Sequence, residues 1–355
     1  DGAVLVLDNT TGEVLAWVGS SGDLSDAAQV DGVLARRQPG STLKPFVYQL
    51  AFEKRLITPA SLLDDAPAQI STAAGLYLPQ NYERDFKGWV SARTALGASL
   101  NVPAVRVAEL LGPDALHARL NQLGLDLAES AGHYGHSLAL GGAEVTLLAL
   151  TNAYRILANG GRFSPVKLSG DARPSTLPAK TVADPAAVFL VTDILADNNA
   201  RARTFGLDSA LATRGFAAVK TGTSKDLRDN WCIGFTDRYT IGVWVGNAGG
   251  EPMHGVSGVS GAAPVWQALA RHLHAGRPSI RPGAPAGVVT ARVQFDAQRE
   301  PARDEFFVAG TEQPRQSAGT QVAAAQAFGI TSPRDGSIFA LDPDMPPAAQ
   351  RIRFE

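Results

Sequence analysis

The stretch RRQPGSTLKPFVYQL, residues 36–50, holds the feature from which the fold can be predicted. Residues 42–54 have the apolar content of a helix, and proline is tolerated only near a helix start, so Pro45 predicts a beginning close to Ser41. Lys44 then lies in the first turn, where the partial positive charge of the helix end disfavours a cation. A local rule broken in this way often marks a functional site. The alternative is a solvated lysine beside an ordinary serine N-cap.

Ser41 and Lys44 are one helical turn apart, so their side chains share a face of the helix. A serine hydroxyl becomes a nucleophile when a base removes its proton. A lysine becomes that base when burial or a positive helix end lowers its pKa. An S-x-x-K pattern arises by chance in about half of chains of this length, so the pair needs support from other residues.

The stretch ASLNVPAV, residues 98–105, places Ser99 and Asn101 at the start of a second predicted helix. Serine and asparagine are good N-caps, and capping is the simpler explanation of each. Together with a third stretch, however, Ser99 and Asn101 strengthen the interpretation of Ser41 and Lys44 as a nucleophile and its base.

In the third stretch, AVKTGTSKD, an apolar strand ends in Lys220, Thr221, Gly222 and Thr223. Gly222 removes a side chain that would block a ligand approaching the strand edge. The threonine hydroxyls and the fixed charge of the lysine suit a substrate carboxylate. The alternative is a solvated strand end with a turn glycine.

Strands open the chain, helices fill its middle, and strands with a final helix follow. The first and last strands can share one antiparallel sheet beside a helical layer, which is an α+β plan. Strands are predicted at 3–7, 14–18, 216–221, 230–236 and 239–246, and helices at 42–54, 102–111, 114–123, 144–158, 185–197 and 262–274.

A change of composition near residue 276 predicts a domain boundary. Residues 1–276 form the first domain, and the proline- and glycine-rich residues 277–290 form a linker. Residues 291–355 are expected to form a small β-rich domain that is incomplete at Glu355. Its β-like pieces are 288–295, which begins in the linker, 328–331, 337–341 and 350–354.

Composition and charge exclude some classes of function. The formal net charge of −2 over 355 residues gives no electrostatic footprint for nucleic acid. The most apolar stretch, 138–158, is interrupted by Glu144, Asn152 and Arg155, so no membrane span is expected. Because the chain starts at Asp1 inside a strand-like run, we expect a longer protein whose preceding part holds an anchor.

Other polar residues receive structural interpretations. His133 and His136 have no metal-ligand partners at a convincing spacing, so zinc is not expected. Asp64 and Asp65 are expected to be a solvated pair or a helix start rather than an acid–base dyad. Residues 253–258, MHGVSG, form either the rim of a site or a flexible loop.

The three motifs occur in the order S-x-x-K, S-x-N and K-T-G, which is the set found in β-lactamases and penicillin-binding proteins. Leu100 stands where that set usually has aspartate. The flanks QPGSTLKPFVY, SLNVPAVRVAE, KTGTSKDLRDNWCIGFT and YTIGVWVGN, with the opening GAVLVLDNTTGEVLAWVG, extend the match. Residues 1–275 therefore resemble the transpeptidase domain of class A, bifunctional penicillin-binding proteins. The tail FGITSPRDGSIFALDPDMPPAAQRIRFE resembles an extra C-terminal domain found in one type of them.

The resemblance implies an α+β fold of the penicillin-binding and serine β-lactamase type, and acyl transfer as the reaction. Ser41 would attack the carbonyl between the two terminal D-alanines of a peptidoglycan stem peptide, and an amine of a neighbouring stem would then take the acyl group. Lys44 would accept the proton of Ser41. Ser99 would relay protons between Lys44, Lys220 and the leaving amine.

The resemblance also implies how the substrate is held. Asn101 would hold the substrate amide and Lys44, while Thr221, Gly222 and Thr223 would receive the terminal carboxylate. The backbone N–H groups of Ser41 and Thr223 would form the oxyanion hole. A β-lactam would acylate Ser41, and neither a metal nor an organic cofactor is implied.

Partners and location follow from the same resemblance. The partners would be stem peptides, β-lactams and, through the C-terminal unit, other cell-wall synthesis proteins. The location would be the periplasmic face of the bacterial inner membrane. A DD-carboxypeptidase or a β-lactamase would use the same motifs, but a lactamase needs a base that activates water on the acyl-enzyme, and no motif for one is evident. A β-lactam-binding or partner-binding module with weak turnover is the alternative from another class.

Overall fold

The chain is described here by a computed structural model. It describes residues 1–68, 70–72, 75–77, 80–81, 85–168, 180–206, 209–213 and 215–318. The predicted β-like pieces at 328–331, 337–341 and 350–354, and the tail that contains them, lie outside the described residues.

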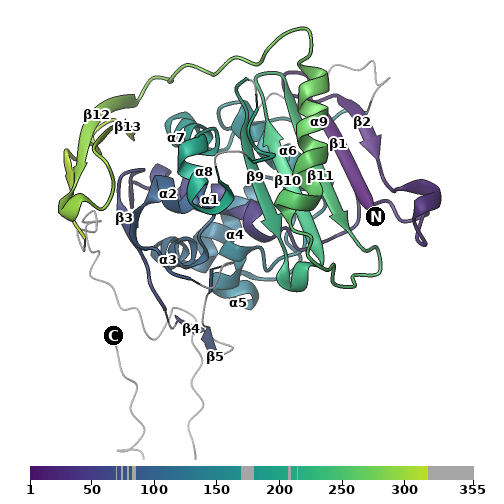
Figure 1. Cartoon of the computed structure of the whole chain (residues 1–355), viewed down its shortest axis with the longest axis horizontal. Helices are drawn as coiled ribbons and strands as arrows, with labels where there is room; N and C mark the ends of the chain where they lie inside the picture. Colours follow the sequence, from purple (N-terminus) through teal and green to yellow (C-terminus); the bar gives the residue numbers. More distant parts are fainter. Residues whose placement is uncertain are drawn as a thin grey trace, which may run out of the picture. The chain divides into compact units, whose positions relative to one another are not determined.

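A five-stranded sheet in the order β2-β1-β11-β10-β9 is the centre of the fold (Figure 1). All neighbouring strands are antiparallel, with Asp8 opposite Tyr239 and Phe235 opposite Thr240. The first strands of the chain therefore pair with strands that come after the helices, as predicted. The strands are β1 (Gly2–Asp8), β2 (Val14–Val18), β9 (Ala218–Thr223), β10 (Asp229–Phe235) and β11 (Tyr239–Gly246).

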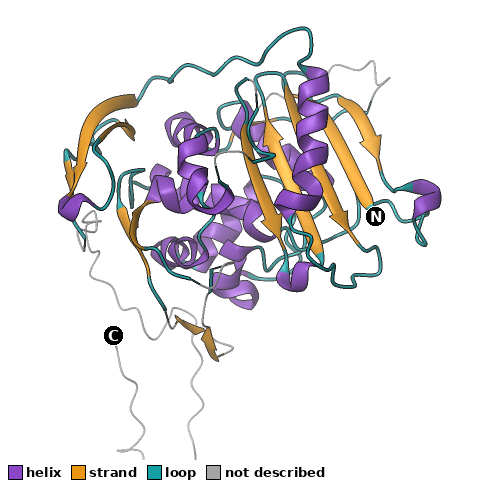
Figure 2. Cartoon of the chain, viewed as in Figure 1, coloured by secondary structure: helices purple, strands orange, loops and turns teal. Residues whose placement is uncertain are grey.

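Helices cover both faces of this sheet, as Figures 1 and 2 show, with α9 in front of it and α6 behind it. Side chains alternate between the two cores: Leu5 and Leu7 of β1 pack on the side of α6, whereas Val6 packs with Trp266 of α9. The helices are α1 (Lys44–Glu53), α2 (Ala92–Gly97), α3 (Asn101–Leu111), α4 (Pro113–Gln122), α5 (Ala131–Tyr134), α6 (Leu147–Ala158), α7 (Pro185–Leu195), α8 (Asn198–Phe205) and α9 (Ala263–Leu273).

Three short sheets and one three-stranded sheet complete the described secondary structure. The three-stranded sheet joins β12 (Val288–Phe295) to β13 (Arg303–Val308) and β14 (Arg315–Gln316). The pairs of short strands are β3 (Leu62–Asp65) with β6 (Gly88–Ser91), β4 (Ile70–Thr72) with β5 (Gly75–Tyr77), and β7 (Arg162–Phe163) with β8 (Lys180–Thr181).

The β12–β13 hairpin packs on the residues that precede it. Phe307 shares a core with Ala60 and Leu62, and the ring of Phe306 lies 5.2 Å from that of Phe189 in α7. Residues 1–322 accordingly form one compact unit by their contacts. The predicted division into domains at 277–290 stays a prediction.

The predicted helix around Ser41 differs in one detail. Gly40–Leu43 form a 3-10 turn, here η2, and α1 begins only at Lys44. Leu43 occupies the N-cap position of α1 and makes no side-chain cap. The alternative prediction, in which Ser41 is the N-cap of this helix, is therefore wrong. Lys44 is 0% exposed, which also excludes the solvated lysine. None of the helices among the described residues is both long and apolar enough to cross a membrane.

Candidate active site

One cleft of about 830 Å³ collects residues from all three sequence motifs. Ser41 enters it from η2, Ser99 from the turn between α2 and α3, and Asn101 from the first position of α3. The strand β9 supplies the third motif from the edge of the sheet. The predicted site residues that line it are Ser41, Ser99, Asn101, Thr221, Gly222 and Thr223. Lys44 and Lys220 reach it through hydrogen bonds to Ser99.

The amine of Lys44 is held between two oxygen acceptors. Its Nζ donates to Oδ1 of Asn101 and to the backbone oxygen of Ser99, both at 2.6 Å, and lies 3.4 Å from Oγ of Ser99. Burial, and then the charge of Lys220, lower the pKa of Lys44 well below its usual value, while Asp65 opposes the shift. In the neutral amine the two short bonds use both N–H groups, which leaves the lone pair able to accept a proton.

Ser99 connects the two lysines. Its Oγ lies 2.7 Å from Nζ of Lys220, and its backbone has a φ of +60°. A left-handed conformation costs a residue other than glycine about 1–2 kcal/mol. This conformation lets the backbone oxygen of Ser99 accept from Lys44 while its Oγ accepts from Lys220. The simpler capping interpretation is wrong, because Leu100 is at the N-cap of α3 and makes no side-chain cap.

Lys220 is buried and donates to Oγ of Ser99 and, at 2.8 Å, to the backbone oxygen of Thr221. Burial is the main cause that lowers the pKa of Lys220 from 10.5 to about 7. The sequence predicts a fixed charge at Lys220. The structure instead places a group that exchanges a proton near neutral pH, because the low-polarity surroundings disfavour the cation.

Residues outside the motifs fix the orientation of Asn101. Its Nδ2 donates to the backbone oxygen of Gln80 at 2.6 Å, and its N–H donates to Oδ1 of Asn81 at 2.8 Å. Both carboxylate oxygens of Asp65 accept from Nδ2 of Asn81 at 2.8 Å. Asp65 is 0% exposed at the end of β3, so the expected solvated pair is wrong for this residue. No local pattern in the sequence indicates this contact, because Asp65 and Asn81 lie 16 residues apart.

Two glycines set the distance between η2 and β9. A Cβ on Gly222 would lie 2.3 Å from the oxygen of Pro39, and one on Gly40, whose φ is +55°, would lie 2.5 Å from the oxygen of Thr223. Gly222 was expected to clear space for a ligand. Its position shows another reason, which is that it lets the turn carrying Ser41 approach the strand.

The third motif faces the cleft as predicted, with a partner that the sequence did not indicate. Oγ1 of Thr223 accepts from the backbone N–H of Gly258 at 3.1 Å, so its own proton remains available for a ligand. Gly258 is the last residue of the stretch 253–258 that was expected either at the rim or in a flexible loop. Among the described residues, no three His, Cys, Asp or Glu side chains are close enough to hold a metal ion.

Comparison with known proteins identifies the family. Residues 2–256 match the family described as the penicillin binding protein transpeptidase domain. The chain belongs to this family. The resemblance stated from the three motifs and the predicted transpeptidase fold are thereby confirmed.

Curated relatives add a finer likeness. The chain is 40% identical over 267 residues to penicillin-binding protein 1C of Escherichia coli (strain K12), which covers 74% of this chain and 33% of that protein. It is 32% identical over 312 residues to penicillin-binding protein 1A of Neisseria lactamica, covering 83% and 38%. The chain thus spans well under half the length of either relative. Penicillin-binding protein 1C is also the type of protein whose extra C-terminal domain the tail, residues 328–355, resembles in sequence.

Solved structures share the fold. Penicillin-binding protein 1A from Haemophilus influenzae superposes with a TM-score of 0.74 at 24% identity, covering 89% of this chain and 54% of that one. The PonA1 protein from Mycobacterium tuberculosis in complex with penicillin V gives a TM-score of 0.66 at 24% identity, covering 80% of each chain.

Proposed function

We propose that this chain is a DD-transpeptidase that crosslinks peptidoglycan stem peptides through a serine acyl-enzyme. The observation that carries the proposal is the pair of buried lysines that share the hydroxyl of Ser99 in the cleft of Ser41. Lysines with lowered pKa are suited to move protons at neutral pH. The family to which the chain belongs supports the same activity.

In the acylation step, neutral Lys44 takes the proton of Ser41 as Oγ bonds to the carbonyl carbon between the two terminal D-alanines. The backbone N–H groups of Ser41 and Thr223 stabilise the oxyanion that forms. The C–N bond then breaks, and the leaving amine of D-alanine receives a proton through Ser99. The proton comes from Lys44, and Lys220 holds the Ser99 hydroxyl in place from the other side.

The remaining motif residues orient the substrate. One N–H of Asn101 Nδ2 is used by Gln80, so the other can donate to the substrate amide. Thr221 and Thr223 donate to the terminal carboxylate, beside Gly222. An amine of a second stem then attacks the acyl carbonyl, an amide forms, and Ser41 is released with its proton.

The same site would take a β-lactam as a substitute for the D-Ala-D-Ala terminus. Attack of Ser41 opens the lactam ring, so the amine stays tethered and the acyl group remains on the serine. PonA1, which shares this fold, is described in complex with penicillin V. A location at the periplasmic face of the inner membrane follows from the proposed substrate, and docking of other wall-synthesis proteins on the C-terminal residues stays a prediction.

The first test is the intact mass of the protein after incubation with penicillin. We expect one drug mass on the native chain and none on Ser41→Ala. Ser137→Ala is the matched control, because Ser137 lines the same cleft but donates to the backbone of Tyr134, and it should be labelled normally. Absence of an adduct on folded native protein would refute the proposed nucleophile.

A second test separates transpeptidase from carboxypeptidase. A D-Ala-D-Ala stem peptide is supplied with an amine acceptor, and the products are separated by mass. A crosslinked amide supports the proposal, whereas only the shortened acid would assign hydrolysis. Acylation by penicillin without either product would favour a β-lactam-binding module.

A further inference from the structure

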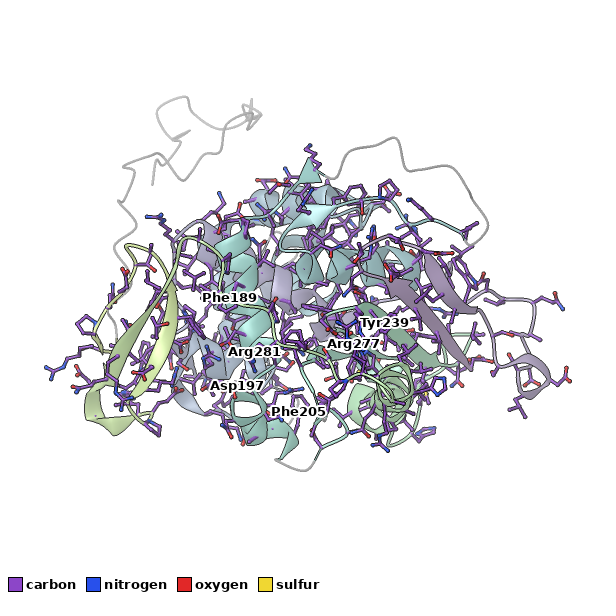
Figure 3. The ribbon with its side chains drawn as sticks, turned by 90° about the horizontal axis from the view of Figure 1, so that it is seen from above. Phe189, Asp197, Phe205, Tyr239, Arg277 and Arg281 are labelled. Atoms are coloured by element: carbon purple, nitrogen blue, oxygen red, sulfur yellow. The ribbon has the colours of Figure 1, made fainter. Side chains whose placement is uncertain are left out.

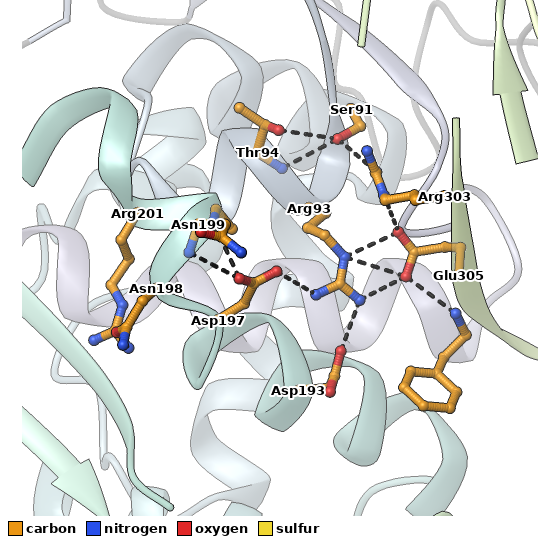
Figure 4. A network of polar contacts seen from close by, with 12 residues as sticks. Ser91, Arg93, Thr94, Asp193, Asp197, Asn198, Asn199, Arg201, Arg303 and Glu305 are labelled. Carbon is orange, nitrogen blue, oxygen red and sulfur yellow. Dashed lines mark hydrogen bonds and ion pairs between the residues drawn. The ribbon is translucent and has the colours of Figure 1, made fainter. Parts of the chain in front are cut away.

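Arg93 of α2 is the centre of a buried ion network outside the cleft (Figure 4). Its Nη2 lies 2.5 Å from Oε1 of Glu305 and 2.7 Å from Oδ2 of Asp193, and its Nη1 lies 3.1 Å from Oδ2 of Asp197. Arg93 is 8% exposed and Glu305 is 1% exposed. Burial opposes the charge of Arg93, but its bonds to Glu305 and the charges around it raise its pKa above the usual value.

The β12–β13 hairpin also contacts the residue that caps the start of α2. Ser91 is the N-cap of α2, and its backbone N–H donates to Oε1 of Glu300 at 2.8 Å. Arg303 donates to Oγ of Ser91 at 3.1 Å and pairs with Glu300 at 2.7 Å. Glu300 and Arg303 therefore hold Ser91 at the start of α2, and Glu305 holds Arg93 two residues further on.

The same network reaches the other end of α2 through α8. Asp197, which binds Arg93, is the N-cap of α8. A Cβ on Gly97 would lie 2.6 Å from Cβ of Ala200, so the two helices touch there. Oγ1 of Thr204 donates to the backbone oxygen of Ala98 at 2.9 Å. The residue next to Ser99 is thus held by a helix that Arg93 anchors.

A fourth segment closes the network from above. Arg281 lies between α9 and β12, over α7, where Figure 3 labels it with Phe189 and Asp197. Its Nη1 is 2.6 Å from Oδ1 of Asp193, whose other oxygen binds Arg93. Arg281, which follows α9, therefore adds a charge to the network through Asp193 of α7.

We propose that Glu305, acting through Arg93, positions Ser99 for proton transfer in the reaction proposed above. Ser99 has a left-handed backbone, and a strained residue persists only where its surroundings determine it. The segment 91–98 supplies those surroundings, clamped at its start by the hairpin and at its end by α8. Glu305 and Arg93 touch no reacting atom, so they are positioning residues. Only the expected change in acylation rate rests on the proposed function; the expected change in hydrogen exchange does not.

The test compares two adjacent residues of β13. Glu305→Gln keeps the shape and removes the buried charge. Asp304→Asn removes an exposed charge, 68% accessible, that pairs with Arg292 on the surface. We expect Glu305→Gln to lower the maximal rate of acylation by saturating penicillin at least about tenfold, with a smaller change in apparent affinity. Asp304→Asn should match the native chain in both.

Hydrogen exchange gives a readout that does not depend on activity. In Glu305→Gln, the amides of residues 98–101 should exchange faster than in the native chain, and in Asp304→Asn they should not. A lower melting temperature with native acylation rate and native exchange at 98–101 would overturn the proposal. If the native chain does not react with penicillin, the proposed function fails, while the exchange data still decide whether Glu305 holds the Ser99 turn.

Thr204→Val serves as the second variant if Glu305→Gln does not fold. It removes the bond to Ala98 and leaves the ion network intact. We expect the same direction in the acylation rate and in exchange at 98–101. Native values for both would show that α8 does not hold Ser99, and would overturn the proposal.

Discussion

Replacing Gly222 with alanine tests how Ser41 is placed against β9. The new Cβ would lie 2.3 Å from the oxygen of Pro39 and 2.8 Å from Cγ2 of Thr42. Ordinary contact begins near 3.4 Å, so in a close-packed interior η2 must retreat by about 1 Å. A misplacement of about 1 Å can cost about 100-fold in rate, and we expect that loss in acylation by penicillin. Overpacking should also lower the free energy of unfolding by about 1–3 kcal/mol.

The assay is the time course of labelling by a fluorescent penicillin across a concentration series, with thermal unfolding of the same samples. Gly132→Ala is the matched control, because its Cβ would meet nothing within 4 Å. It should leave both quantities unchanged. If Gly222 served mainly to admit the ligand, Gly222→Ala would weaken apparent affinity and keep the maximal rate and the stability. That result would contradict the role of Gly222 in placing η2 against β9.

Three further predictions concern charge and strain. Asp65→Asn removes the charge that raises the pKa of Lys44, so the acid limb of the acylation–pH profile should move to lower pH; an unchanged limb would contradict this. Lys220 has a pKa of about 7 in the folded chain and 10.5 ordinarily, so the unfolded chain binds more protons between those values and stability should rise with pH across that window. Melting temperatures at about pH 7.5 and 9.5 should show a smaller rise in Lys220→Met, and an equal rise would count against the lowered pKa. Ser99→Gly relieves the left-handed strain but removes the hydroxyl, so acylation should fall about 10²–10⁴-fold while stability is kept. Arg55→Gly is the control, because it relieves similar strain at an exposed position with a φ of +56°, and it should leave acylation unchanged. A loss of acylation in Arg55→Gly as well would show that the loss in Ser99→Gly does not come from the missing hydroxyl.

The five strands of the central sheet, six of the described helices and the motif residues that line the cleft could be predicted because their signals are local. Apolar runs mark the strands, and three short motifs mark the residues that the fold brings together. The elements α2, α5, α8, β3 to β8, β13 and β14 were not predicted, because they are short or polar and give no clear apolar pattern. The burial of Asp65 could not be predicted, because its partner Asn81 lies 16 residues away, after the short strands β4 and β5. A buried aspartate and a solvated one look alike in a sequence.

Arg93 shows the same limit on a larger scale. The run SARTALG contains an arginine of a kind that usually faces solvent. Its partner Glu305 is 212 residues away, and the pair is buried where β13 packs against α7, next to α2. The close approach of Pro39 and Thr42 to Gly222 could not be predicted either, since the sequence indicates a need for space but does not say which neighbour fills it.

The order of the strands has a consequence for how the cleft comes into being. β1 lies between β2 and β11, and Asn9 accepts a hydrogen bond from Thr240, 231 residues further along the chain. Pairings between such distant segments form late, because the entropy of closing the long loop is lost before their contacts stabilise it. The turn η2, which carries Ser41, meets β9 across a similarly long separation in the chain, between Gly40 and Thr223, so the wall that faces Ser41 also forms late. Reactivity toward penicillin should therefore appear last in refolding, and its onset would time the closure of the sheet.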